Sequence, residues 1–326
     1  MNSKKIKYTV AVVGAGRIAV GFDTPDSREV LTHAHAIAKN SRLKLLGITD
    51  TNAEGGKKAA IKWGTKFFPD LKQLLSLHAD IIVVATPDST HAKILQEIYN
   101  SVNKPKLVIC EKPLVVTKKE LKSIRKLTAK PILLVNYSLR FDPLFRKIKK
   151  DLSNGIYGKV ISAHATYTNG LFHNGSHTID IARFFFGEMK TCRATFSTND
   201  VAGGTPSMGG VATFERCPQF SLMIGDERSF SASGFEILTE RGRLRFINFN
   251  YEFSFEEVIP DPNYAGFNAL SKPKIIKTER MKAFPNLYKH AVNVLDEVER
   301  SISPLDEAIK SQEACFRFFE SFKKVI

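Results

Sequence analysis

The chain has 326 residues, a length that suits two domains better than one core. Apolar residues make up 43% and charged residues 25%, which is ordinary for a soluble globular protein. No apolar run approaches the ~18 residues that cross a bilayer, so the sequence excludes a membrane-spanning helix and predicts a cytoplasmic protein. The formal charge of +15 raises nucleic acid as a partner, but the lysines are spread along the chain without interleaved aromatic residues. We therefore expect no nucleic-acid binding.

Four cysteines lie far apart, and no two form a C-x-x-C pair. Their positions are Cys110, Cys192, Cys217 and Cys315. The spacing predicts reduced thiols and neither a metal site nor a disulfide framework.

Up to residue 136, apolar runs rich in β-branched residues alternate with helical stretches. The runs predict strands at residues 9–13, 43–49, 81–85, 107–110 and 132–135. The stretches between them predict helices at residues 53–62, 70–77, 91–100 and 118–129, with Asp70 and Thr117 as N-caps. Repeated β-α units predict a doubly wound parallel sheet, so we expect an α/β Rossmann domain over residues 1–136.

After Asn136 the pattern changes. Helices are predicted at residues 142–152, 176–186, 285–301 and 305–323, and a strand at residues 160–168. Successive strands from 191 to 259 have no helices between them, which predicts antiparallel pairing. Residues 261–282 carry the weakest pattern. We expect an α+β domain with a largely antiparallel open sheet over residues 137–326, for substrate binding and dimerisation.

A glycine-rich turn follows the first predicted strand. Gly14, Gly16 and Ala19 match the G-x-G-x-x-A dinucleotide fingerprint in the context that it requires. Gly14 permits the tight turn, Gly16 lets the backbone approach a pyrophosphate, and Ala19 allows close packing of strand and helix. Backbone N–H groups at the start of the next helix, around Arg17 and Ile18, would then face the phosphates. A purely structural glycine turn is the alternative.

An acidic residue should end the second strand and bind the ribose hydroxyls, and Asp50 stands there. It lies farther from the turn than the usual ~20 residues because of a turn-rich insertion at residues 22–27. A carboxylate repels a 2′-phosphate, so we expect NAD(H) to be preferred. NADP(H) stays an alternative, because Lys57 and Lys58 follow in the next helix.

Three further segments complete a recognisable set. They read Ala85-Thr86-Pro87-Asp88-Ser89-Thr90-His91, Cys110-Glu111-Lys112-Pro113 and Gly175-Ser176-His177-Thr178-Ile179-Asp180. With the glycine-rich turn, they resemble in order and spacing the family of glucose-fructose oxidoreductase, inositol dehydrogenase and the rhizopine-catabolism proteins (Gfo/Idh/MocA). The resemblance implies that Thr86, Pro87, His91 and Glu111 line the cofactor cleft. For His91, a hydrogen-bonded histidine at the start of a helix is the alternative.

The resemblance also implies the catalytic residues. Lys112 would lie beside the nicotinamide and the substrate, where its ammonium polarises the substrate oxygen. His177 matches the family's acid/base histidine, since imidazole titrates near neutral pH. Asp180, three residues later on the same helical face, would contact substrate or orient the site. The alternatives are a solvated lysine at position 112 and, for Asp180, a first-turn charge favoured by the helix dipole.

One position departs from the family pattern. Four residues before the acid/base histidine the family commonly has an aspartate, and this chain has His173. An imidazole does not raise its neighbour's pKa or hold its tautomer as a carboxylate does, which speaks against the inositol type. The resemblance implies that the sugar-nucleotide branches of the family tolerate variation here, so we expect this chain to belong with them. Tyr137 and His173 are expected near the substrate. His33 and His35 follow the insertion, and we assign neither to catalysis.

We therefore expect an NAD(H)-dependent oxidoreductase that transfers a hydride between nicotinamide and a hydroxyl or carbonyl carbon of a sugar or sugar nucleotide. The substrate would sit between the Rossmann cleft and the open sheet face of the second domain. The resemblance implies a homodimer or homotetramer. The alternative is a family member that binds NAD without turnover and acts as a sensor or partner-binding protein.

Overall fold

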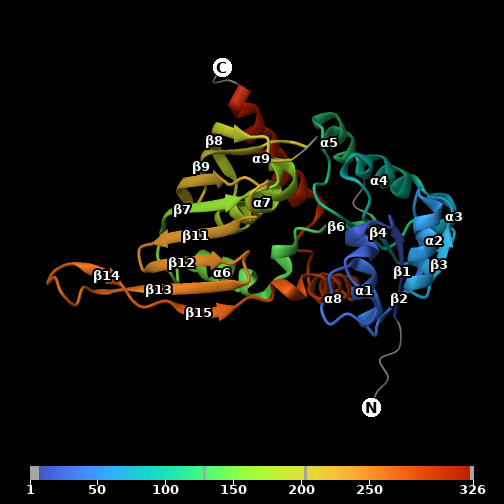
Figure 1. The fold of residues 1–326 in the computed structure, drawn as a ribbon, viewed down its shortest axis with the longest axis horizontal. Helices are drawn as coiled ribbons and strands as arrows, with labels where there is room; N and C mark the ends of the chain where they lie inside the picture. The colour runs from blue at the N-terminus through green and yellow to red at the C-terminus, as the bar shows by residue number, and fades with distance from the viewer. Residues whose placement is uncertain (1–6, 128–129, 202–203, 324–326) are drawn as a thin grey trace, which may run out of the picture. The chain divides into compact units, whose positions relative to one another are not determined.

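The computed structural model describes residues 7–127, 130–201 and 204–323, and the chain divides into two compact units (Figure 1). Unit 1 consists of Met1–Phe141 and Met281–Ile309, and unit 2 consists of Asp142–Arg280 and Lys310–Ile326. The boundary expected after residue 136 therefore falls inside the first stretch of unit 1. Residues 281–309, which the sequence placed in the second domain, return to unit 1.

Unit 1 contains a six-stranded parallel sheet with the order β3-β2-β1-β4-β5-β6. Its strands are β1 (Tyr8–Val13), β2 (Leu43–Thr49), β3 (Lys66–Phe68), β4 (Ile81–Val84), β5 (Leu107–Cys110) and β6 (Ile132–Val135). Val10, Val12 and Ile109 are fully buried, as both faces of a parallel sheet require. This strand order confirms the expected Rossmann class.

The helices of unit 1 are α1 (His33–Lys39), α2 (Ala53–Lys62), α3 (Leu71–Leu75), α4 (His91–Asn100), α5 (Lys118–Ile124) and α8 (Ala283–Leu295). Both predicted N-caps are confirmed. The side chain of Asp70 accepts a hydrogen bond from the N–H of Gln73, and Thr117 forms a capping box with Glu120. Helix α5 ends at Ile124, and its predicted end at Ala129 lies outside the described residues.

Unit 2 contains a nine-stranded sheet with the order β14-β13-β12-β11-β7-β10-β9-β8, and β15 also pairs with β13. Its strands are β7 (Val160–Tyr167), β8 (Met189–Thr198), β9 (Ser207–Phe214), β10 (Cys217–Ile224), β11 (Ser233–Thr239), β12 (Gly242–Ile247), β13 (Glu252–Pro260), β14 (Asn268–Leu270) and β15 (Lys274–Lys277). The sheet is largely antiparallel, as expected. The successive pairs β8–β9, β9–β10, β11–β12 and β12–β13 are antiparallel, which confirms the prediction for residues 191–259. Strand β10 also pairs in parallel with β7, which lies before that range.

Aromatic side chains fill the core of unit 2 on one face of this sheet. Phe145 of α6 (Pro143–Ser153) and Phe185 of α7 (Ser176–Phe186) both stack with Phe246 of β12. Phe316 of α9 (Leu305–Lys323) packs edge-on against Phe172. Helix α6 begins as predicted, since Asp142 accepts a hydrogen bond from the N–H of Leu144.

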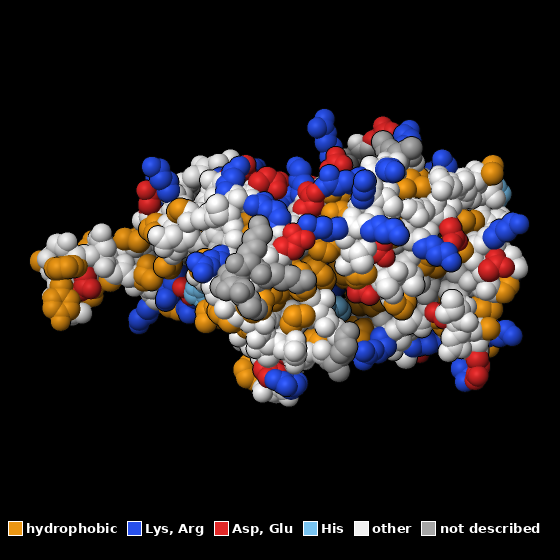
Figure 2. Space-filling model, turned by 90° about the horizontal axis from the view of Figure 1, so that it is seen from above, with side chains coloured by type: hydrophobic (Ala, Val, Ile, Leu, Met, Phe, Trp, Pro, Cys, Tyr) orange, Lys and Arg blue, Asp and Glu red, His pale blue; other side chains and the backbone are white. Residues whose placement is uncertain are grey.

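The segment with the weakest sequence pattern forms a ribbon at the sheet edge. Strands β14 and β15 pair one after the other with β13 between residues 252 and 277. Figure 2 shows apolar side chains at the end of this ribbon, and exposed Tyr264 and Phe267 lie there. Over the face seen in Figure 2, Lys and Arg side chains are interspersed with Asp and Glu side chains. None of the helices in the described ranges combines the length and apolar character of a bilayer-crossing segment.

Candidate functional site

The glycine-rich turn packs tightly against the loop that follows β4. Gly14 has φ +104°, and a Cβ atom there would lie 2.4 Å from the carbonyl oxygen of Ala85. The N–H of Gly14 donates to the carbonyl of Thr49 at 2.8 Å. A side chain at position 14 would therefore clash with backbone as well as strain the turn.

Gly16 lies in the opposite situation. Its φ of −72° is open to every residue type, and no atom lies within 4 Å of the place that a Cβ would take. The free space above this backbone is what a pyrophosphate needs for close approach. Ala19 is fully buried in the core beneath, as its predicted role requires.

The helix that follows the turn is shorter than the fingerprint predicts. Arg17 and Ile18 open η1 (Arg17–Gly21), a single wide helical turn, and the longer α1 begins only at His33. The carboxylate of Asp23 holds the intervening chain, because it accepts hydrogen bonds from the Leu31 N–H and from His35 Nδ1. The donors available to phosphates thus come from the turn and η1.

Asp50 lies at the turn, as predicted. Its Oδ2 accepts from the N–H of Ala15 at 2.6 Å, and its Oδ1 accepts from the N–H of Asn52 at 2.7 Å. The carboxylate is half-buried at the end of β2. These contacts fix a negative charge beside the glycine-rich turn, where a ribose would lie in this fold.

His91 connects the loop after β4 to the loop after β5. It is 1% exposed, and its ring nitrogens lie 2.9 Å from the carbonyl oxygen of Pro113 and 3.0 Å from that of Thr86. Pro87 precedes the short η2 turn (Asp88–Thr90) that leads to His91. The contacts make His91 a brace between two loops, and contact of Thr86, Pro87 and His91 with a cofactor stays a prediction.

Glu111 and Lys112 follow β5 directly. Glu111 is buried, Lys112 is half-buried, and the peptide bond between Lys112 and Pro113 is cis. Burial raises the pKa of Glu111, but the hydrogen bond and charge of His33, a hydrogen bond from Asn136 and the charge of Lys112 outweigh it. The pKa of this carboxyl is therefore held below its usual value.

Sequence reasoning missed the partners of Glu111. His33, which the sequence does not assign to catalysis, and Tyr288 belong to one buried cluster with Glu111 and Asn136. Tyr288 lies 255 positions from His33, so no local pattern connects them. Tyr137, predicted to contact substrate, is 1% exposed and follows β6.

The remaining predicted residues lie in unit 2. His173 is exposed in the short wide turn η4 (Gly170–Gly175), and His177 is half-buried in the first turn of α7. Asp180 is 1% exposed and accepts a hydrogen bond from Ser311 Oγ at 2.5 Å. The guanidinium of Arg183 donates to the same Ser311 Oγ at 2.6 Å. Asp180 thus joins α7 to α9. The alternative of a first-turn charge is wrong, because no acidic residue lies in the first turn of α7, and the catalytic role of Asp180 stays a prediction.

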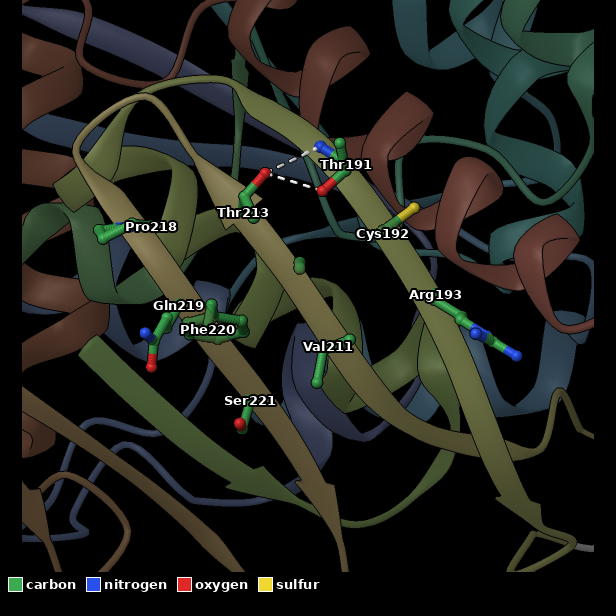
Figure 3. A pocket seen from close by; sticks show the side chains of 10 residues that line it. Thr191, Cys192, Arg193, Val211, Thr213, Pro218, Gln219, Phe220 and Ser221 are labelled. Carbon is green, nitrogen blue, oxygen red and sulfur yellow. Dashed lines mark hydrogen bonds between the residues drawn. The ribbon is translucent and has the colours of Figure 1, made fainter. Parts of the chain in front are cut away.

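A separate pocket of about 400 Å³ lies on the sheet of unit 2 (Figure 3). Thr191 and Arg193 on β8, Val211 and Thr213 on β9, and residues 218–221 on β10 line it. The hydroxyls of Thr191 and Thr213 lie 2.8 Å apart. Within the described ranges, no three His, Cys, Asp or Glu side chains cluster as a metal site would require.

Comparison with known proteins assigns residues 8–137 to a known family. Residues 8–137 match the sequence model of an oxidoreductase family with an NAD-binding Rossmann fold. Inositol 2-dehydrogenase of Rhizobium meliloti is 25% identical over 197 residues, which are 54% of this chain and 54% of that protein. The matched region thus spans about half the length of this curated relative.

Solved structures share the fold over nearly the whole chain. A myo-inositol dehydrogenase from Corynebacterium glutamicum has a TM-score of 0.74 at 18% identity and covers 98% of this chain and 97% of its own. The WlbA dehydrogenase from Bordetella pertussis, solved with NADH and UDP-GlcNAcA, has a TM-score of 0.74 at 19% identity and covers 98% of both chains. At these identities the likeness establishes the fold alone. Residues 8–137 therefore form an NAD-binding Rossmann domain of the Gfo/Idh/MocA oxidoreductase family.

Proposed function

We propose that this chain is an NAD(H)-dependent oxidoreductase acting on a hydroxyl or carbonyl carbon of a sugar or sugar nucleotide. One observation carries the proposal: the backbone at Gly16 is open for a pyrophosphate while the carboxylate of Asp50 is fixed at the same turn. Lys112 follows β5 in the same unit, at the carboxyl ends of the parallel strands, where ligands bind in this class of fold.

The protein groups would share the chemistry as follows. A bound nicotinamide supplies the acceptor or donor of the hydride. Lys112 donates a hydrogen bond to the substrate oxygen and stabilises the negative charge that develops on it. His177 accepts the hydroxyl proton during oxidation and returns it during reduction, and Asp180 orients this part of the site. Tyr137 and His173 would bind the substrate.

NAD(H) is the proposed cofactor rather than NADP(H). The carboxylate of Asp50 lies 2.6 Å from the N–H of Ala15, so a 2′-phosphate at this turn would meet a fixed negative charge. Fluorescence titration with NADH and NADPH tests the preference. We expect NADH to bind more tightly in the wild type, and Asp50→Asn to narrow the difference. Equal affinities in the wild type would contradict the proposal.

The substrate is proposed to be a sugar nucleotide. The motive is His173, which replaces the aspartate common in inositol-type relatives, and a related dehydrogenase of the same fold was solved with UDP-GlcNAcA. The test is to incubate the protein with NAD and a panel of inositols, sugars and nucleotide sugars while following the absorbance of NADH. Turnover with nucleotide sugars is the expected outcome. Tight NADH binding without turnover on the whole panel would favour the sensor alternative.

We further propose that the chain forms a homodimer or homotetramer through the open sheet face of unit 2. Val211, Met223 and Leu238 lie on the face opposite the aromatic core, and they are 51%, 51% and 37% exposed. Apolar groups gathered on one open face are typical of subunit interfaces. Sedimentation should show a shift toward monomer for Met223→Glu. The matched control is Ile61→Glu, which alters an 81% exposed residue of α2 in unit 1 and should change nothing.

A further inference from the structure

A buried hydrogen-bonded cluster lies beside Lys112 in unit 1. His33 opens α1, and its side chain is fully buried. Its Nε2 lies 2.8 Å from Glu111 Oε1, and its Nδ1 lies 2.9 Å from Tyr288 Oη. The cluster therefore joins α1, the end of β5 and α8, which are far apart in the sequence.

The direction of the bond between His33 and Glu111 follows from the carboxylate. The pKa of Glu111 is held below its usual value, so the group is ionised at neutral pH and its oxygens accept hydrogen bonds. His33 Nε2 must therefore carry a proton and donate it. On the other side, burial and the charge of Glu111 raise the pKa of Tyr288 well above its usual value, so its hydroxyl stays protonated.

A second donor fixes the same carboxylate oxygen. Asn136 Nδ2 donates to Glu111 Oε1 at 2.6 Å, and the Asn136 backbone N–H donates to the carbonyl of Cys110 at 2.8 Å. Two donors from different elements on one oxygen leave the carboxylate little freedom to rotate. The contact with Asn136 thus ties Glu111 to the end of β6 as well as to α1.

Aromatic rings pack against His33 in this cluster. The ring of Phe284 packs edge-on against His33 with centroids 4.9 Å apart, and the ring of Tyr288 does so at 5.9 Å. The other titratable neighbour is the Cys110 thiol, whose pKa is raised well above its usual value by burial and by Glu111. The thiol and the phenol both stay neutral, whereas the charge of Lys112 contributes to lowering the pKa of Glu111.

We propose that His33 is a positioning residue for Lys112: by donating to Glu111, it holds that carboxylate in one orientation beside the lysine ammonium. A buried hydrogen bond in a water-poor site restrains its partners more than an exposed one does. The ammonium is attached to the residue that follows Glu111, so a fixed anion limits where it can lie. The inference rests on the proposed role of Lys112.

The central experiment measures the ionisation of Glu111 by infrared spectroscopy over pH, with Glu111→Gln identifying its carboxylate band. His33→Asn keeps a polar group toward Tyr288 and withdraws the donor from Glu111. We expect the midpoint of Glu111 protonation to rise by about one pH unit or more in His33→Asn. His35→Asn is the matched control: His35 is equally buried on the same helix but pairs with Asp23 at 2.8 Å, so the Glu111 midpoint should not move. An unchanged midpoint in His33→Asn would overturn the inference.

Turnover gives the second readout. In His33→Asn, kcat should fall toward the ~10²-fold loss that a misplacement of ~1 Å causes, while the KM for NAD changes little. His33→Gln, whose amide reaches as far as Nε2, should restore most of kcat. Loss of stability alone would give equal effects in both variants, so thermal melts of each accompany the kinetics.

The two readouts separate this inference from the proposed function. The infrared titration needs no substrate and no turnover. If the wild type turns over nothing but Glu111 shifts in His33→Asn, the proposed function fails and the hydrogen-bonded restraint stands. If the wild type turns over a sugar nucleotide and neither Glu111 nor kcat responds to His33→Asn, the inference fails and the proposed function stands.

Discussion

At the scale of single residues, Lys112 is the position where a small chemical change should have the largest effect on turnover. Lys112→Met keeps an unbranched apolar side chain, one atom shorter than that of lysine, and removes the ammonium. Because the proposed interaction strengthens as charge develops on the substrate oxygen, kcat should fall by several orders of magnitude, roughly 10³-fold or more. Stopped-flow kinetics and NADH titration check this, and the Kd for NADH should stay nearly unchanged. Activity equal to the wild type would remove Lys112 from the mechanism.

Residues within a motif could be predicted because each motif is local. The sequence predicts Gly14 and Gly16 at a turn because they follow a strand, and it predicts Asp50 at the end of the second strand. The hydrogen bond from the Ala15 N–H to the Asp50 carboxylate confirms that Asp50 lies at this turn. The cluster around Glu111 could not be found in this way. His33 and Tyr288 meet only because α1 and α8 pack together, and a contact across 255 positions leaves no periodic signal in the sequence.

At the scale of elements, the two glycines of the turn make a matched pair of substitutions. Gly14→Ala places a Cβ 2.4 Å from the Ala85 carbonyl oxygen at a φ of +104°, so the fold should lose about 1–3 kcal/mol or more of stability. Gly16→Ala meets no protein atom within 4 Å, so its Tm should be unchanged while the Kd for NADH rises. Thermal melts with and without NADH check both. A wild-type Kd in Gly16→Ala would argue against a pyrophosphate at this turn.

Asp296 holds two elements together through a pH-dependent contact. At the end of α8 it accepts hydrogen bonds from Lys7 Nζ at 2.5 Å and Tyr8 Oη at 2.7 Å, and it pairs with Arg42 at 2.6 Å. Hydrogen bonds from Lys7 and Tyr8 hold the pKa of Asp296 well below its usual value, and Arg42 lowers it further. Burial raises this pKa, but its effect is smaller than that of the two hydrogen bonds. The ionised form is therefore favoured by folding.

The sign of its pH dependence follows. A carboxyl with a lowered pKa in the folded state stabilises the protein fully above its unfolded value of ~3.9, and this stabilisation is lost as the pH falls below it. Asp296→Asn should lower Tm by about 2–4 °C at pH 7, with a diminishing difference from the wild type below pH ~4. Melts at several pH values check this. A difference independent of pH would mean that packing, and not charge, joins α8 to β1.

Elements with strong periodicity were predicted nearly to the residue, and weak ones were missed. Helices at 53–62, 91–100 and 176–186 match α2, α4 and α7 because their apolar spacing and end signals are local. Strand β3 has three residues, and β14 and β15 are short edge strands with largely exposed side chains. Such strands are held by pairing with a neighbour, so their own sequence carries little pattern.

At the scale of the whole molecule, residues 281–309 belong to unit 1, so no single boundary along the sequence separates the two units. Leu287, Tyr288 and Ala291 of α8 are fully buried in the same core as Val10 and Ile48. The chain after α8 also joins the sheet, since Ser303 Oγ donates to the carbonyl of Val135 at 2.7 Å. Composition and periodicity alone predict α8 as a helix of the second domain, because the core residues that it packs against lie near the other end of the chain.

This arrangement predicts how fragments behave. Residues 1–141 alone would expose the core that α8 covers, and each large apolar side chain lost from it removes about 1.5–3 kcal/mol from a fold worth about 5–15 kcal/mol. We expect this fragment to melt without cooperativity and to bind no NADH. Joining 281–309 to it through a flexible Gly/Ser linker should restore a cooperative transition, followed by circular dichroism, and NADH binding, followed by fluorescence. A cooperative melt of residues 1–141 alone would show that the Rossmann sheet folds without its distant helix, and the contacts of Tyr288 would then be secondary to stability.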